Sequence, residues 1–203
     1  MEQKLIKLDS KQTYQFELKT AKELGITIKN VKFFSGHDGM AGINADLYYN
    51  NKKFASAYDD ARGGEMDVRP SDYENTTVST FHEVETKLRA TSKYIHVHTH
   101  APDGKPYGGK PFEMESQVDL ASLVDALARH KEELKEAKKG IQYTTKDGDY
   151  YHHWGMSIPA LMKKHPKTAL ASIQRRYDEL SAKYPIRNTE YLSSIGIRVH
   201  NLL

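Results

Sequence analysis

The chain has 203 residues, no cysteine, and 30 Lys and Arg against 27 Asp and Glu, a formal charge of +3. The lack of cysteine excludes disulfides, thiolate zinc sites and cysteine nucleophiles, and tight nucleic-acid binders usually carry a larger basic excess. No apolar run is long enough for a signal peptide or a transmembrane helix. We therefore expect a cytoplasmic protein without a membrane partner. Its length suits one domain over residues 1–203, with a possible sub-boundary near residues 91–115.

Alternating apolar and polar residues mark the N-terminal part of the chain. The alternation includes Tyr14, Phe16 and Leu18, and it continues through residues 26–34. A period of two residues is typical of a strand with one buried face. We therefore predict strands through most of the first fifty or so residues.

Two apolar runs over residues 43–49 and 52–58 flank the pair Asn50 and Asn51. Asn tolerates positive φ, so this spacing predicts a β-hairpin with a tight turn. Together with the run before it, the hairpin predicts an antiparallel sheet over residues 26–58.

Helical periodicity begins after Pro70. Ser71 and Glu74 have the spacing of a capping box, which predicts a helix near residues 71–90. A short strand is expected over residues 93–101.

The C-terminal half contains two further helical segments, near residues 116–139 and 158–183. His165 and Pro166 interrupt the second of these segments. A hairpin over residues 141–151 is expected between the two segments, and a last strand over residues 195–199. We therefore predict an α+β fold, in which an antiparallel sheet is packed with about three helices.

Three histidines alternate in the segment His96, His98 and His100. On a strand, alternate side chains project from one face, and imidazole is the commonest metal ligand at physiological pH. A half-exposed strand without a catalytic role explains the same pattern, so our primary expectation is no cofactor and no metal.

An alternative follows from His98, His100, Ser116 and Asp119, whose arrangement resembles that of the JAMM/MPN zinc metalloproteases. The resemblance implies zinc bound by His98, His100 and Asp119, with Ser116 assisting the oxyanion. The chain departs from that pattern at Ala101, where the family has Pro. The family's upstream general base could be either of two residues, Glu83 or Glu85.

The segments NVKFF (30–34) and ADLYYNNKKFASAYDDARGGE (45–65) resemble small proteins of bacteriophages and mobile elements. The resemblance covers roughly residues 26–70 and 119–151, and Ala61 stands where those proteins often have Gly. It implies an accessory factor that binds or inhibits a host protein, including host defence systems.

Our primary expectation is therefore a non-enzymatic binding protein with a host protein as its partner. The predicted binding residues combine aromatic and charged side chains, which anchor interfaces, with a Gly-rich turn: Tyr48, Tyr49, Asp59, Asp60, Arg62, Gly63, Gly64 and Glu65. The zinc hydrolase is one alternative. Weak nucleic-acid binding is the second, suggested by five basic residues of the last predicted helix: Lys163, Lys164, Lys167, Arg175 and Arg176.

Overall fold

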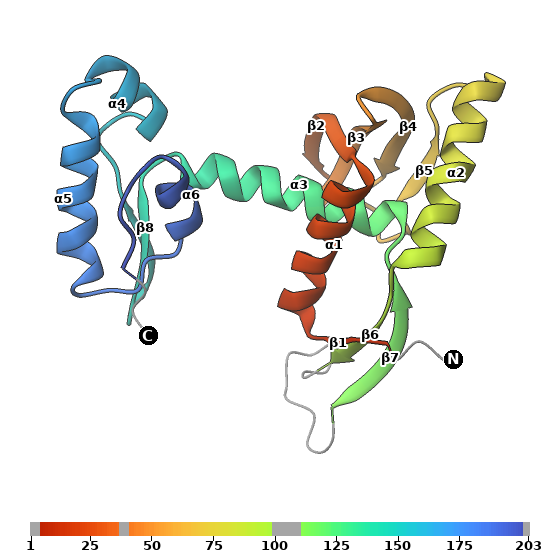
Figure 1. Cartoon of the computed structure of the whole chain (residues 1–203), viewed down its shortest axis with the longest axis horizontal. Coiled ribbons are helices and arrows are strands. Elements are labelled where there is room, and N and C mark those ends of the chain that lie inside the picture. Colours follow the sequence, from red (N-terminus) through yellow and green to blue (C-terminus); the bar gives the residue numbers. More distant parts are fainter. Residues whose placement is uncertain (1–4, 37–40, 99–110, 201–203) are drawn as a thin grey trace. The chain divides into compact units, whose positions relative to one another are not determined.

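A computed structural model describes residues 5–36, 41–98 and 111–200 (Figure 1). The chain divides into two compact units, Met1–Arg129 and His130–Leu203, and each unit has its own apolar core. Helices and antiparallel strand pairs are present in both, so the predicted α+β class is confirmed. Within the described ranges, no helix is long and apolar enough to cross a membrane.

Among the described residues, the first unit contains these strands and complete helices: β1 (Lys7–Leu8), α1 (Ser10–Leu24), β2 (Ile26–Ser35), β3 (Ala41–Tyr49), β4 (Lys52–Asp59), β5 (Asp67–Pro70), α2 (Asn75–Thr91), β6 (Lys93–His98) and β7 (Phe112–Gln117). Helix α3 (Leu120–Ala137) begins in this unit and ends in the second. The second unit adds β8 (Ile141–Thr145), β9 (Gly148–His152), α4 (Ile158–Lys164), α5 (Ala169–Ser181) and α6 (Thr189–Ser194).

The first helix, α1, occupies a segment for which alternation predicted a strand, and that prediction was wrong. Asp9 and Gln12 form a reciprocal capping box, in which Gln12 N donates to Asp9 Oδ1 at 2.8 Å and Asp9 N donates to Gln12 Oε1 at 3.0 Å. Tyr14 and Ala21, seven residues apart, are both buried on the same side of the helix. The caps and the helical period therefore outweigh a short alternating pattern.

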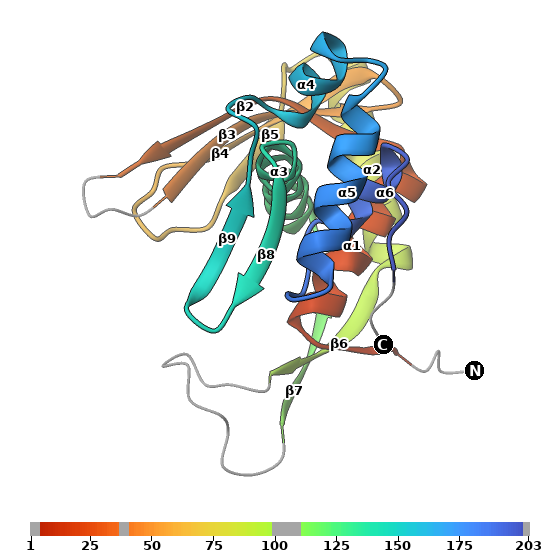
Figure 2. The same ribbon diagram turned by 90° about the vertical axis from the view of Figure 1, so that its left-hand side faces the viewer.

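The four-stranded sheet is antiparallel in the order β2-β3-β4-β5. Asn50 and Asn51 have φ of 47° and 67°, as the tight turn between β3 and β4 requires. The predicted hairpin is therefore confirmed. Figure 2 shows β2, β3 and β4 running side by side as one layer.

Helices cover one face of this sheet. Ala21 of α1, Leu88 of α2 and Val124 of α3 belong to the same buried cluster as Leu47 and Phe54 of the sheet. Burying a Val, Leu or Phe side chain in such a cluster stabilises the fold by about 1.5–3 kcal/mol. The alternate residues of the strands point to the other face, and Asn44, Asp46 and Tyr48 of β3 are only partly buried there.

Helix α2 begins three residues later than a capping box at Ser71 requires. Glu74 is its N-cap and makes no side-chain cap hydrogen bond, whereas Asp72 Oδ1 accepts a hydrogen bond from Glu74 N at 3.0 Å. Ser71 is therefore not the cap. A short polar turn at Asp72 precedes the helix, because an Asp side chain readily accepts a hydrogen bond from the backbone N–H two residues further along the chain.

A smaller sheet has the order β1-β6-β7. Ser116, predicted to start a helix, lies in β7 and pairs with Tyr94. The cap of α3 is Asp119 instead: Ser122 N donates to Asp119 Oδ1 at 2.8 Å, and Asp119 N donates to Ser122 Oγ at 3.1 Å. The strand was missed because β7 is short and mostly polar, with little apolar alternation to mark it.

In the second unit, β8 and β9 form the predicted hairpin (Figure 2). Helices α4 and α5 are separated at the predicted break, where Pro166 cannot continue a helix. Their buried side chains form the core of the unit with Ile141 and Leu192.

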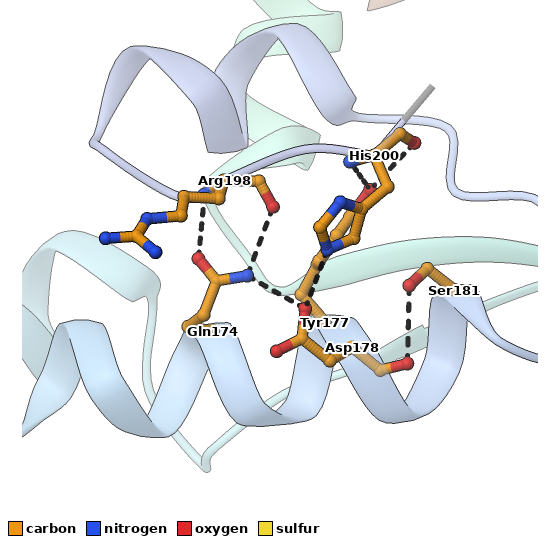
Figure 3. A network of polar contacts seen from close by, with 6 residues as sticks. All are labelled: Gln174, Tyr177, Asp178, Ser181, Arg198 and His200. Atoms are coloured by element: carbon orange, nitrogen blue, oxygen red, sulfur yellow. Dashed lines mark hydrogen bonds and ion pairs between the residues drawn. The ribbon is translucent and has the colours of Figure 1, made fainter. Parts of the chain in front are cut away.

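The predicted last strand, residues 195–199, is absent. The segment lies along α5 without strand pairing and is held by side chains that bond its backbone (Figure 3). Arg198 N donates to Gln174 Oε1 at 2.7 Å, and Gln174 Nε2 donates to Arg198 O at 3.1 Å. The Gln174 amide thus takes the place of a neighbouring strand, while Ile197 is buried in the core.

The prediction of one domain remains a prediction. Two compact units with separate cores do not by themselves show whether the units unfold together, and the boundary at residues 129–130 lies beyond the sub-boundary proposed near residues 91–115.

Candidate binding surface

Polar and aromatic side chains occupy the open face of the four-stranded sheet. Along β3, Asn44, Asp46 and Tyr48 alternate with the buried residues Ile43 and Leu47. Alternate residues of a strand point to opposite faces, so these three lie on the open face. Their direct partners on β2 and β4 face the same way, and the set comprises Thr27, Lys29, Lys32, Lys53, Ser56 and Tyr58.

Asp46 is the centre of a polar network on this face. Its Oδ1 lies 2.8 Å from Lys53 Nζ and accepts from Ser56 Oγ at 3.4 Å, and its Oδ2 accepts from Asn30 Nδ2 at 2.7 Å. Desolvation raises the pKa of Asp46, but the hydrogen bonds from Lys53 and Asn30 outweigh it and hold the pKa below its ordinary value. The carboxylate is therefore ionised at neutral pH and fixes the positions of its donors.

A hollow of about 620 Å³ lies over the same network, and its lining residues come from β2, β3 and β4: Asn30, Val31, Lys32, Asn44, Ala45, Asp46, Ser56, Ala57 and Tyr58. Asn44 Oδ1 is buried and has no hydrogen-bond partner among the described residues. An unsatisfied buried acceptor costs about 1–3 kcal/mol. A ligand that donated a hydrogen bond to this oxygen would recover that energy.

Aromatic rings flank the hollow. The rings of Phe34 and Tyr58 are stacked at 6.3 Å with an interplanar angle of 22°, and Tyr58 is 52% exposed. Lys29 Nζ lies 4.2 Å from the centre of the Tyr48 ring, a cation–π distance. Of the sequence-predicted binding residues, Tyr48 belongs to this surface.

Tyr49, the neighbouring predicted residue, faces the helices instead. Its hydroxyl accepts a hydrogen bond from Lys87 Nζ of α2 at 2.7 Å, and its ring packs against Phe54 at 6.3 Å. Tyr49 therefore joins the sheet to α2, and its role in the structure is that of scaffold.

The remaining predicted residues form the loop after β4. Asp59 Oδ1 accepts from Ala61 N at 2.8 Å, and Asp60 Oδ1 accepts from Arg62 N at 3.0 Å. The two carboxylates thus build successive turns, in which Ala61 and Gly63 have positive φ of 58° and 78°. Arg62, with 85% of its side chain exposed, presents its charge to solvent, as do the exposed residues Asp60 and Glu65. Gly64 is exposed, with open space on the side where a side chain would project.

The predicted patch is therefore split in two. Tyr48 pairs with Lys53 at one end of β4, and Asp59 ends the same strand six residues later. At about 3.3 Å per residue, the two ends are about 20 Å apart. The open face between them was missed as a unit, although the alternation of Asn44, Asp46 and Tyr48 could have revealed it.

Of the three predicted histidines, His96 and His98 share one face of β6, with ring centres 4.2 Å apart. Desolvation, and then the nearby His98, lower the pKa of His96. His100 lies outside the described residues. Thr13 Oγ1 lies 3.3 Å from His96 Nδ1, so His96 contacts α1.

Asp119 does not join this pair. It follows Gln117, which pairs with Lys93 at one end of β6, whereas His98 is at the other end. Five residues separate these ends by about 17 Å, while ligands of one zinc ion each lie about 2 Å from it. Within the described ranges, no group of three or more His, Asp or Glu is placed to hold a metal.

A second hollow of about 380 Å³ in the first unit is lined by residues of α1, β2, β3, β6 and α3: Ser10, Thr13, Tyr14, Glu17, Phe33, Ile43, His96, Asp125, Ala126 and Arg129. Desolvation, followed by the charges of Asp125 and Asp119, raises the pKa of Glu17 to about 7. Desolvation and the nearby Asp59 and Asp119 also raise the pKa of Asp125. Glu17 can therefore gain or lose a proton near neutral pH, a property the sequence did not indicate.

Comparisons with known proteins add no further identification. No protein-family model, no curated protein and no solved structure matches the chain.

Proposed function

We propose that this protein is a binding protein whose partner docks on the open face of the β2–β5 sheet. The observation that carries the proposal is the hollow beside Asp46, with the unpaired buried oxygen of Asn44 in its lining. A preformed hollow with fixed polar groups is the usual form of a recognition site. A hydrogen bond from the docked protein to Asn44 Oδ1 would favour binding, because this oxygen breaks no existing hydrogen bond when it accepts one.

The chemistry of the face suits a protein partner. The face presents the exposed ring of Tyr58 and the ring of Tyr48, over which the Lys29 ammonium group lies. It also carries charges of both signs, at Asp46 and Lys53. Aromatic and charged anchors of this kind dominate the energetics of protein interfaces. Mixed charge supplies complementarity to a specific surface.

We further propose that the partner is a host protein and that the chain is an accessory factor of a phage or mobile element. This step rests on the resemblance of residues 26–70 to such proteins. The hairpin that carries most of the resemblance also forms the centre of the open face.

A site-specific cross-linking experiment tests the proposal. A photoreactive residue at Ser56 on the open face, and separately at Arg62 in the loop, would be used for capture from bacterial lysate. We expect one host protein to cross-link from Ser56 and to be lost when Tyr58→Ala is added.

The control is Tyr49→Phe, which alters the face packed on α2 and should leave capture unchanged. Cross-linking from Arg62 alone would move the interface to the loop. Capture that survives Tyr58→Ala and Asn44→Ala would contradict the proposal.

A further inference from the structure

The formal charge is distributed unequally along the chain. Residues 130–203 hold 13 Lys and Arg against 8 Asp and Glu, a charge of +5, whereas residues 1–129 hold 17 against 19, a charge of −2. Between Asp149 and Asp178 no acidic residue occurs. The small positive charge of the whole chain is therefore the sum of a basic second unit and a slightly acidic first unit.

This acid-free stretch contains helix α4, the N-terminal part of helix α5 and the short turn that joins them. Helix α4 ends at Lys164 and α5 begins at Ala169, so four residues connect them. The chain changes direction there, and α4 lies beyond the N-terminal end of α5 (Figures 1 and 2). Two helices joined through a turn of three or four residues are a common way to present a helix to nucleic acid.

The turn carries three lysines, Lys163, Lys164 and Lys167, which we call the basic turn. All three are exposed. None of them takes part in the ion pairs found among the described residues, in contrast with Lys135 and Lys139 of α3, which pair with glutamates. Their charge is therefore open to an anion from outside.

The N-terminal end of α5 adds a second attraction for anions. Its N-cap, Thr168, makes no side-chain hydrogen bond to the first turn of the helix. Leu170 and Ala171, in that turn, are exposed. Helix N-termini with free N–H groups bind phosphate through these groups and through the helix dipole.

The acidic residues of α5 lie at its other end and are engaged within the unit. Glu179 pairs with Arg176 at 2.7 Å. Asp178 contacts Gln174 and His200 where the C-terminal segment crosses the helix (Figure 3). The repulsive charges are thus kept away from the basic turn.

We propose that the basic turn and the N-terminal end of α5 bind duplex DNA through its phosphates. A helix with its side chains is about 10–12 Å wide, which the major groove of B-DNA, about 12 Å wide, accepts. The major groove of A-form RNA is too deep and narrow to be read by side chains. Leu170 and Ala171 offer no hydrogen bonds to base edges, so binding is independent of sequence. This inference does not depend on the open face of the sheet.

The test measures fluorescence anisotropy of a labelled DNA duplex with the full chain at about 50 to 200 mM salt. Three phosphate contacts predict a slope of log K against log salt of about −2.7, or about a 40-fold loss of affinity over this range. The variant Lys163→Gln/Lys164→Gln/Lys167→Gln should lower affinity at 50 mM salt by at least about tenfold and bring the slope close to zero.

A matched control removes the same charge elsewhere in the chain, at Lys135→Gln/Lys146→Gln/Lys183→Gln, and should bind nearly as well as the original protein. Circular dichroism should show both variants folded, because every changed lysine is exposed. Equal losses in the two variants would overturn the proposal. So would tighter binding to duplex RNA or to anionic vesicles, or no binding to DNA at 50 mM salt.

Discussion

The two units of this chain present different kinds of surface. In the first unit, the open sheet face carries charges of both signs that already bond one another around Asp46. In the second, the basic turn carries one sign of charge and no internal partner among the described residues. We propose that the first arrangement recognises a partner by shape and hydrogen bonds, and the second by charge. A formal charge of +3 for the whole chain describes neither.

The largest expected effect tests whether the two units unfold separately. Leu47 is 0% exposed in the core of the first unit, so Leu47→Ala should cost about 2–5 kcal/mol. Trp154, the single tryptophan, lies in the second unit. Because the two cores share no residue, we expect the Trp154 fluorescence transition in denaturant to stay unchanged while the far-UV transition shifts.

The reciprocal change sharpens this test. Ile173 is 0% exposed in the second core, and Ile173→Ala should shift the Trp154 transition by a similar amount. If fluorescence and circular dichroism move together in both variants, the units unfold as one, and the single domain predicted from sequence is correct.

The next effect is a pH dependence of stability that we expect in the first unit, where Glu17 lies. The pKa of Glu17 is raised to about 7, so the folded state holds this proton more tightly than the unfolded chain. Stability of the first unit should therefore fall as pH rises from about 4.5 to 7. The full shift corresponds to about 3.4 kcal/mol, and because the side chain is partly exposed to solvent we expect a smaller loss, on the order of 2 kcal/mol.

Glu17→Gln should remove this pH dependence and stabilise the protein at pH 8 relative to the original chain. Denaturant unfolding at pH 5 and pH 8 provides the measurement. An unchanged difference between the two pH values in the variant would show that Glu17 is not the titrating group.

A smaller effect is expected at Asp46. Its pKa is lowered, so its contribution to stability is present above the unfolded value of 3.8 and is lost as pH falls through the folded value. Asp46→Asn should lower stability at pH 7 by about 1 kcal/mol, since exposed ion pairs contribute little. Chemical denaturation at pH 7 measures it; a loss of the same size at pH 2 would point to packing and not to charge.

The loop after β4 offers a change in the opposite direction. Ala61 has a φ of 58°, a conformation that costs a residue with a Cβ about 1–2 kcal/mol relative to Gly. Ala61 is 3% exposed, so losing its methyl group offsets part of this gain. We expect Ala61→Gly to raise stability by up to about 0.5 kcal/mol, as a small increase in melting temperature. A clear decrease would show that the buried methyl group matters more.

The smallest effect is expected at His98. We expect His98→Ala to change stability by less than about 0.5 kcal/mol and elemental analysis of protein without a His-tag to find no zinc in proportion to the chain. About one zinc per chain, lost in His98→Ala, would make the zinc hydrolase the favoured function in place of the binding protein.

The sequence predicted best where a local rule acts alone. The turn at Asn50 and Asn51 and the break at Pro166 both lie where residue chemistry placed them, because positive φ and a missing N–H are properties of single residues. Prediction failed at Tyr14 to Leu18, where a capping box at Asp9 decided for a helix, and at residues 195–199, where Gln174 replaced a strand partner.

Among the candidate binding residues, the sequence alone could not show which of two adjacent residues lies on the open face of the sheet. Tyr48 and Tyr49 have the same chemistry, yet one lies on the open face and the other bonds Lys87. The position of the helices decides which face is open, and those contacts join residues far apart in the chain.

By itself, the sequence determined the α+β class, the hairpins and the absence of cysteine chemistry. Tertiary structure alone decided that Asp46, Asn44 and Tyr58 share one hollow, that Glu17 lies among other carboxylates, and that Asp119 is remote from His98. The physical reason is the separation along the chain of the residues that interact. Turns and caps depend on residues within four positions of one another, whereas a hollow, a desolvated carboxyl or a ligand set depends on distances that only the packed chain defines.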